Sequence, residues 1–204
     1  MKVFLAVLLA CGGAMAADEK VLFQDTFKGK LVEGWSWLRE DAADWRAAPD
    51  GLEVRLQPGD ANSVKNALVR PLPKAEGKLV IEVTVTSLSE PTEQYEQAGL
   101  TLYHEDKPVF KLVHERVDGK LVVVPGKVPA EKLSVRLRLI VGGGRFIAQF
   151  RQEGEKEFQT AAEGDLAIAD GDKISVQGYH GPAETAHWIR FSDFTVKAET
   201  SSAK

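Results

Sequence analysis

The feature that most constrains the fold of this chain is the alternation of apolar and polar residues at every second position. The alternation recurs along most of the sequence, in the segments 51–57, 78–88, 99–104, 109–117, 120–124, 133–141, 145–151, 173–179 and 188–196. Successive side chains of a β-strand point to opposite faces of a sheet, so this pattern predicts strands with one buried face and one face in water. No long segment has helical periodicity.

Short turn-forming sequences separate these segments and predict antiparallel connections. They include Asp118-Gly119, Pro125-Gly126 and the three glycines at 142–144. The glycine run is followed by another strand pattern and not by a helix, so it is interpreted as a hairpin connection and not as a phosphate-binding loop. About a dozen strands are too many for one flat sheet, and they favour an all-β fold, a two-sheet antiparallel jelly-roll sandwich.

The composition excludes several classes of protein. The chain has 204 residues and a net charge of −4, so it lacks the excess of Lys and Arg that a strongly basic nucleic-acid binder needs. Its 44% of hydrophobic residues is ordinary for a chain with a packed core. Its one cysteine, Cys11, lies in the N-terminal segment. The folded domain is therefore expected to have no disulfide, no thiolate nucleophile and no cysteine-bound zinc.

The N-terminal residues have the pattern of an export signal. Lys2 precedes the apolar run 3–10, and Ala14-Met15-Ala16 forms a signal-peptidase motif, which predicts a signal peptide at residues 1–16. The alternative is a bacterial lipoprotein signal with Cys11 as the lipid-bearing residue. No other stretch approaches the roughly 20 apolar residues of a membrane span. We therefore expect an extracytoplasmic protein, periplasmic or secreted, with a domain at 17–197 and a flexible tail at 198–204.

Several short motifs follow one another in a characteristic order. They are Asp25-Thr26-Phe27, the tryptophan-bearing segment 35–45, and the segments 51–54, 66–70, 97–100, 111–115 and 190–194. Together they resemble the concanavalin A-like jelly-roll domain found at the C-terminus of family 43 β-xylosidases, and a related bacterial domain of unknown function. The resemblance implies a concanavalin A-like sandwich. It does not assign an activity, because this fold hosts lectins, glycosidases, lyases and structural modules.

Polar residues at alternate positions of consecutive strands predict a polar sheet face. Such positions occur in the segments 97–103, 111–115, 136–138 and 149–151. If these strands are neighbours, their polar side chains line one face of one sheet, the concave face in a concanavalin A-like fold. Forked donors and acceptors beside tryptophans suit a glycan or polysaccharide. The candidate ligand-binding residues are Trp37, Trp45, Gln97, Lys111, Glu115 and Arg138. The alternative is an ordinary solvated face with the tryptophans in the core.

The sequence identifies no catalytic residues. Glu115 is the one carboxylate expected on the polar face within a strand, whereas a two-carboxylate glycosidase needs a partner for it. The four histidines lack metal-ligand spacing. Jelly rolls of the resembled type often carry one calcium ion, and the resemblance makes Asp25 and Asp193 its candidate ligands, with oxygen-only coordination. These two residues are otherwise interpreted as turn or strand-end positions, and no other cofactor is expected.

The leading hypothesis is an exported, non-catalytic carbohydrate-binding domain. One alternative is an enzyme of the same fold, a glycoside hydrolase or a polysaccharide lyase. A lyase could use Tyr103 or His180 as base with Lys111 or Arg136 as charge stabiliser. A further alternative is an envelope protein-interaction module with an exposed apolar patch.

Overall fold

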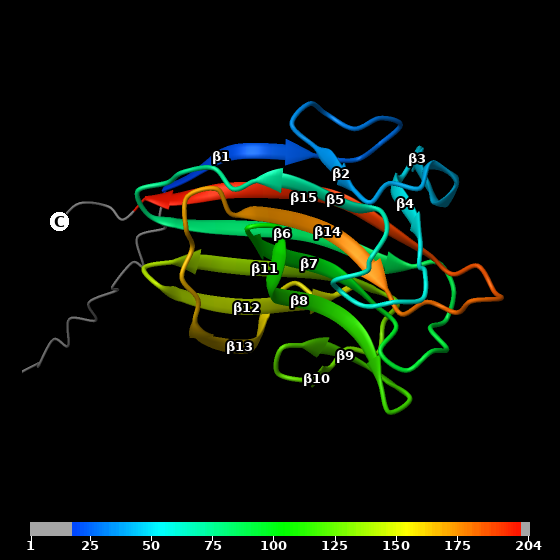
Figure 1. Cartoon of the computed structure of the whole chain (residues 1–204). Coiled ribbons are helices and arrows are strands. Elements are labelled where there is room, and N and C mark those ends of the chain that lie inside the picture. Colours follow the sequence, from blue (N-terminus) through cyan, green and yellow to red (C-terminus); the bar gives the residue numbers. More distant parts are fainter. Residues whose placement is uncertain (1–17, 201–204) are drawn as a thin grey trace, which may run out of the picture.

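The computed structural model describes residues 18–200, and these residues form two antiparallel β-sheets (Figure 1). Sheet A has eight strands: β1 (Asp18–Asp25), β3 (Trp45–Ala48), β4 (Gly51–Arg55), β6 (Lys78–Ser87), β11 (Ser134–Gly142), β12 (Arg145–Gln152), β13 (Gln159–Asp165) and β15 (Trp188–Thr200). Sheet B has seven: β2 (Ser36–Leu38), β5 (Ala67–Pro71), β7 (Gln97–His104), β8 (Lys107–Val117), β9 (Lys120–Val124), β10 (Val128–Pro129) and β14 (Lys173–Tyr179). Within residues 18–200 the one helical element is a short 3-10 turn, Ala42–Asp44.

The order of strands differs from their order along the chain. Sheet A runs β13-β12-β11-β6-β15-β4-β3, with β1 paired to β15, and sheet B runs β10-β9-β8-β7-β14-β5-β2. The N-terminal β1 therefore lies along the C-terminal β15 (Figure 1). The predicted fold class, a two-sheet antiparallel sandwich, is confirmed.

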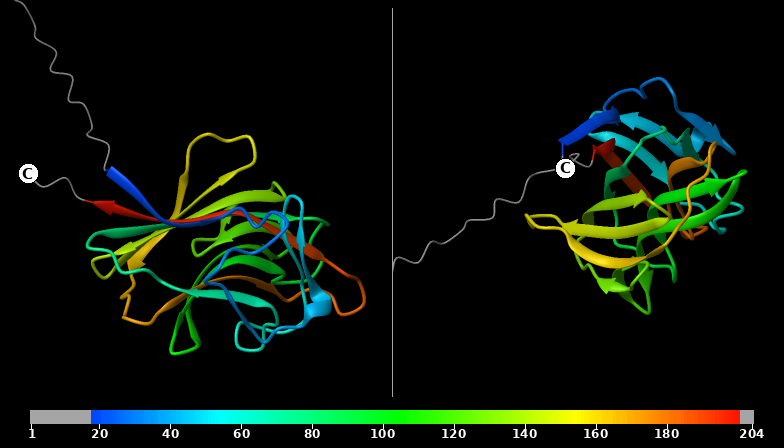
Figure 2. Two further views of the ribbon diagram at one scale, coloured as in Figure 1. Left: turned by 90° about the horizontal axis from the view of Figure 1, so that it is seen from above. Right: turned by 90° about the vertical axis from the view of Figure 1, so that its left-hand side faces the viewer.

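One large hydrophobic core fills the space between the two sheets. Leu100 and Leu112 from sheet B meet Leu137 and Phe150 from sheet A, and all four are fully buried. Burial alternates strictly along β11, as the sequence pattern predicts. Burying a leucine or phenylalanine side chain contributes about 1.5–3 kcal/mol, so this core is the main source of stability. Figure 2 gives the two layers from above and from one end.

The last strand is longer than the sequence predicted. Ala198 and Glu199 were expected in the flexible tail, but they pair with Leu79 and Lys78 of β6 and also with β1. Backbone pairing on both sides holds this segment without any need for large apolar side chains. The remaining tail residues 201–204, the predicted signal peptide 1–16 and Cys11 lie outside the described residues.

Between residues 18 and 200 the structure contains no helix of the length and hydropathy needed to cross a bilayer.

Candidate ligand-binding face

The face of sheet B that points away from the core carries a group of polar side chains, all of them buried except Lys111, with the apolar Val113 of β8 among them. On β7 the alternate residues Ala98, Leu100 and Leu102 belong to the core, so the residues between them point outward. The same alternation holds on β8 and β14. We call this group the polar face; its members are Gln97, Thr101, Tyr103, Lys111, Glu115, Ser175, Gln177 and Tyr179.

The strand register brings residues that are distant in sequence into two rows. Gln97 on β7 lies opposite Glu115 on β8 and Tyr179 on β14. Thr101 lies opposite Lys111 and Ser175. Between the two rows β7 has Gly99, where an added Cβ would approach the carbonyl oxygen of Leu112 to 2.3 Å. Only glycine fits there, so β7 has no side chain between Gln97 and Thr101, while the buried Val113 of β8 lies opposite Gly99.

Lys111 joins the two rows through a pair of hydrogen bonds. Its Nζ donates to Gln97 Oε1 at 2.8 Å and to Glu115 Oε2 at 3.0 Å. The Lys111 side chain is 35% exposed, whereas that of Glu115 is 5% exposed. An ammonium group has three protons and a carboxylate two oxygens, so the pair retains one N–H donor and one acceptor, Glu115 Oε1, without a partner among residues 18–200. A donor and an acceptor thus lie side by side.

Gln177 is the centre of a second hydrogen-bonded group. Its Oε1 accepts from Tyr103 Oη and from Ser175 Oγ, both at 2.8 Å. Its Nε2 is buried without a partner among the described residues, and so is Thr101 Oγ1. A buried polar group without a partner is destabilising by about 1–3 kcal/mol, and it points to a bridging water or a hydrogen-bonding ligand.

Both tyrosines of the polar face are held in the neutral form. Burial raises the pKa of Tyr103, and burial next to Glu115 raises the pKa of Tyr179. A phenol with a raised pKa is a hydrogen-bond donor and a poor general base at neutral pH. The face is therefore better suited to binding than to the lyase chemistry with Tyr103 as base that the sequence suggested.

The suggested pairing of Tyr103 with Arg136 in a lyase site is wrong, because Arg136 lies on β11 of sheet A and Tyr103 on β7 of sheet B.

Two aromatic rings, Tyr95 and His180, border the polar face next to its member Tyr179. Tyr95, just before β7, is 48% exposed, and its ring centroid lies 6.2 Å from that of His180. The His180 ring lies 5.4 Å from that of Tyr179. The backbone of Tyr95 is fixed, since its N–H donates to Arg116 O and its carbonyl accepts from Gln97 Nε2, both at 2.8 Å. The sequence analysis missed Tyr95, Gln177 and Tyr179 as site residues, and it considered His180 only as a possible lyase base.

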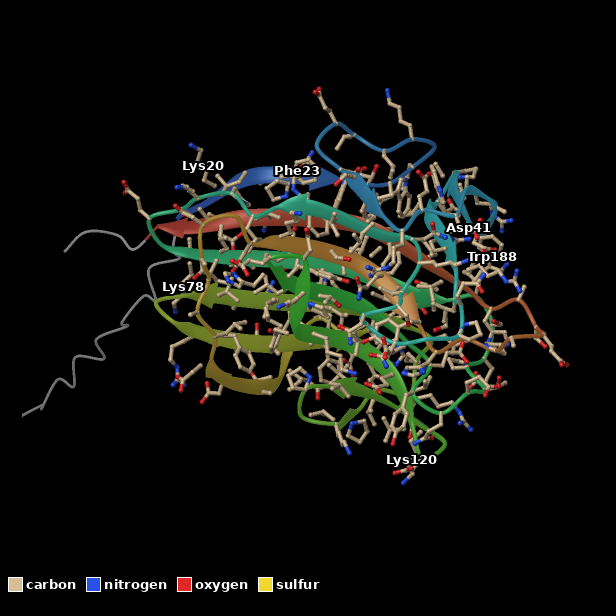
Figure 3. The ribbon with its side chains drawn as sticks, viewed as in Figure 1. Lys20, Phe23, Asp41, Lys78, Lys120 and Trp188 are labelled. Carbon is tan, nitrogen blue, oxygen red and sulfur yellow. The ribbon has the colours of Figure 1, made fainter. Side chains whose placement is uncertain are left out.

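The two tryptophans predicted as ligand contacts lie elsewhere. Trp37 on β2 and Trp45 on β3 are half-buried and stack with ring centroids 4.7 Å apart. They pack against the core where the edge strands of the two sheets meet. Asp41, in the segment between them, and Trp188 lie at one end of the sandwich, away from Lys20 and Lys78 (Figure 3). A role of Trp37 and Trp45 in ligand binding stays a prediction.

Arg138 lies on the outer face of sheet A, so the expectation of one shared polar face is wrong. The chain crosses from sheet B to sheet A between β10 and β11, and β11 pairs with β6 and β12. The face positions of β11 and β12 are therefore separated from those of β7 and β8 by the whole sandwich. Arg138 and Arg136 both donate to the carboxylate of Glu82. Burial favours protonation of Glu82, but the two guanidinium groups hold its pKa below the usual value.

The two predicted calcium ligands have different surroundings. The buried carboxylate of Asp25 accepts from Phe27 N at 2.7 Å, Val32 N at 3.0 Å and Trp35 Nε1 at 3.0 Å. It thus fixes the loop that follows β1. Asp193 is exposed, in the left-handed backbone region at φ 52°. Between residues 18 and 200 no three His, Cys, Asp or Glu side chains are grouped as a metal site. Calcium binding stays a prediction.

Comparison with known proteins adds similarity at the level of fold. No protein-family model and no curated protein matches the sequence. Among solved structures, a Bacteroides ovatus family 43 protein described as "Xyloglucan PUL GH43B" is 15% identical, with a TM-score of 0.66 over 86% of this chain and 39% of that one. A xylan β-1,4-xylosidase from Bacillus halodurans C-125 is 20% identical, with a TM-score of 0.62 over 85% and 38%.

A shorter protein is similar over nearly its full length. It is the CBM2 module of the evolved Dit protein of Lactobacillus casei BL23 phage J-1, which is 9% identical, with a TM-score of 0.61 over 92% of this chain and 99% of that one. This chain covers about two fifths of the length of the two family 43 proteins, 39% of the Bacteroides ovatus protein and 38% of the xylosidase. The resemblance to a β-xylosidase domain predicted from the motifs is confirmed as a structural similarity.

Proposed function

We propose that this protein binds a glycan on the polar face of sheet B. The observation that carries the proposal is the Lys111–Glu115 pair, which keeps one donor and one acceptor free beside Gln97. A sugar hydroxyl both donates and accepts, so neighbouring hydroxyls can bind to such a pair at once. The exposed ring of Tyr95 supplies the flat apolar surface on which a sugar ring can stack.

The comparisons support the choice of polysaccharides for the test. The similar structures include a family 43 protein described with xyloglucan, a xylan β-1,4-xylosidase and a CBM2 module. At identities of 20% or less they support the fold directly and the ligand class only as a proposal.

Affinity electrophoresis through gels with xylan, xyloglucan or bacterial polysaccharides, followed by calorimetry, tests this function. We expect at least one glycan to retard the protein, and Glu115→Gln to weaken binding about tenfold, because it replaces a charge-assisted acceptor. Glu163→Gln, at an exposed position of β13 in sheet A, is the matched control and should bind as the native protein does. Absence of retardation by every glycan, or equal binding by Glu115→Gln, would contradict the proposal.

We also propose that the protein acts outside the cytoplasm, on the basis of the signal pattern at residues 1–16. Mass spectrometry of the exported protein tests this. A chain that begins at Ala17 supports signal-peptide cleavage, a lipid-modified chain that begins at Cys11 supports a lipoprotein, and a full-length cytoplasmic chain contradicts both.

A further inference from the structure

We infer that the polar face takes an uncharged saccharide, held through two adjacent hydroxyl groups by Lys111 and Glu115. This inference rests on the proposed function and specifies its ligand class. Three features of the face carry it: its balance of charge, the hydrogen-bonding groups that remain free, and the exposed aromatic ring at its border.

The eight members of the polar face include one cation and one anion, which are paired with each other, and a second cation, Arg39, lies beside Tyr103 at the other end of the face. Lys111 Nζ lies 3.0 Å from Glu115 Oε2. The other six members of the face are amide, hydroxyl and phenol groups, and the raised pKa values of Tyr103 and Tyr179 keep the phenols neutral. A uronate or sulfate placed here would bring its negative charge next to Glu115 Oε1, in surroundings with little water to screen it. The part of the face around Lys111 and Glu115 therefore disfavours anionic sugars.

The outer face of sheet A has the opposite character. Glu53 is paired with both Arg46 and Arg190, and Glu82 with both Arg136 and Arg138. The Glu82 group thus has two guanidinium ions for one carboxylate, while in the Glu53 group Arg190 also lies 3.9 Å from the exposed Asp50. An anionic ligand would be attracted to sheet A, so the two outer faces predict different responses to neutral and acidic sugars.

The free groups of the polar face match a pair of adjacent hydroxyls. The third Lys111 proton can be donated to one hydroxyl oxygen, while Glu115 Oε1 accepts the proton of the next hydroxyl. Gln177 Nε2 and Thr101 Oγ1, on the same face, are buried without partners among residues 18–200. Because these two atoms are closed to solvent, a buried water that bridges them to a ligand hydroxyl would satisfy them.

Tyr95 completes the arrangement from the side. Its ring is exposed, while its backbone is held by Arg116 and Gln97. Because Gln97 also accepts from Lys111, the backbone of Tyr95 is linked through Gln97 to the Lys111–Glu115 pair. A sugar held by the pair can therefore place its apolar ring face against Tyr95.

Calorimetry with three probes tests this inference: neutral xylo- and gluco-oligosaccharides, the same oligosaccharides with their adjacent hydroxyls O-methylated, and oligogalacturonate. We expect the native protein to bind at least one neutral probe with an affinity that added salt does not reduce. Methylation of the hydroxyls should weaken binding about tenfold or more, because it removes the donated protons. Oligogalacturonate should bind the polar face at least about tenfold more weakly than the neutral probe.

Variants assign these effects to the site. Glu115→Gln and, independently, Tyr95→Ala should weaken the neutral probe about tenfold. Tyr95 is exposed, so its truncation leaves the fold intact, which circular dichroism checks.

The outcomes separate the two proposals. The inference would be overturned if oligogalacturonate bound more tightly than the neutral probe and Glu115→Gln changed that binding. It would also be overturned if the methylated probe bound as tightly as the unmethylated one. Either result would leave the proposed glycan binding in place. Failure of every saccharide to bind would reject both.

Discussion

Lys111 is the residue on which the polar face depends. It donates to Gln97 and to Glu115, and its own side chain is partly exposed while Glu115 is buried. Removal of the cation would leave a buried carboxylate without its partner, and such a charge is more destabilising than the absence of both groups.

We predict that Lys111→Met lowers the free energy of unfolding by about 1–3 kcal/mol at neutral pH. The double variant Lys111→Met/Glu115→Gln should recover most of this loss, because the remaining amide carries no charge. Urea denaturation of the two variants and of Lys120→Met, an exposed control on β9, measures the effect. A Lys111→Met protein as stable as the native one would show that Glu115 does not depend on Lys111.

Sequence alternation identified Gln97, Lys111 and Glu115 because each alternates with core residues within its own strand. The same pattern includes Gln177 and Tyr179, but their place beside Gln97 depends on the pairing of β14 with β7, across more than 70 intervening residues. Tyr95 lies in a turn, where alternation carries no information. Arg138 was correctly predicted to point outward, but its sheet depends on the crossover after β10. Local pattern gives the direction of a side chain and not its partners.

At the scale of strands, Glu82 links β6 to β11 on sheet A. Its carboxylate accepts from Arg136 at 2.9 and 2.7 Å and also from Arg138. Because the folded pKa of Glu82 lies below its ordinary value of 4.5, the unfolded chain takes up the proton at a higher pH than the folded one. The stability that Glu82 contributes is thus present above about pH 4.5 and is lost as the pH falls through the folded pKa.

We predict that Glu82→Gln lowers stability by about 1–3 kcal/mol at neutral pH. We also predict that this difference from the native protein shrinks as the pH is lowered below about 4.5. Urea denaturation at a series of pH values measures both effects, with the exposed Glu153→Gln as control. A difference that stays constant over the acid range would contradict the assigned pairing with Arg136 and Arg138.

The strands that the sequence predicted and those that it missed differ in length and composition. β6 and β11 are long, rich in Val, Ile and Leu, and clearly alternating. β13, with the sequence QTAAEGD, has no large apolar residue and pairs with one neighbour at the sheet edge. Its strand conformation is imposed by pairing with β12. The conformation of such an edge strand depends on its pairing within the folded sheet, so the alternation of apolar and polar residues in its sequence does not predict it.

For the molecule as a whole, stability depends on the two sheets burying one core between them. Leu100 of sheet B and Leu137 of sheet A are both fully buried in it. We predict that Leu100→Ala and Leu137→Ala each lower the free energy of unfolding by about 2–5 kcal/mol. Leu88→Ala, at a position 39% exposed, is the matched control and should have a much smaller effect. Equal effects at Leu88 and Leu100 would contradict the sandwich.

The central claim is that a glycan binds the outer face of sheet B. The most direct test is a nuclear magnetic resonance titration, in which a neutral oligosaccharide that the protein binds is added to the labelled protein. We predict that the largest shifts of backbone amide signals fall on β7, β8 and β14 and at Tyr95, while β11 and β12 change little. Shifts concentrated on β11 and β12, or around Trp37 and Trp45, would contradict the claim and place the ligand elsewhere on the sandwich.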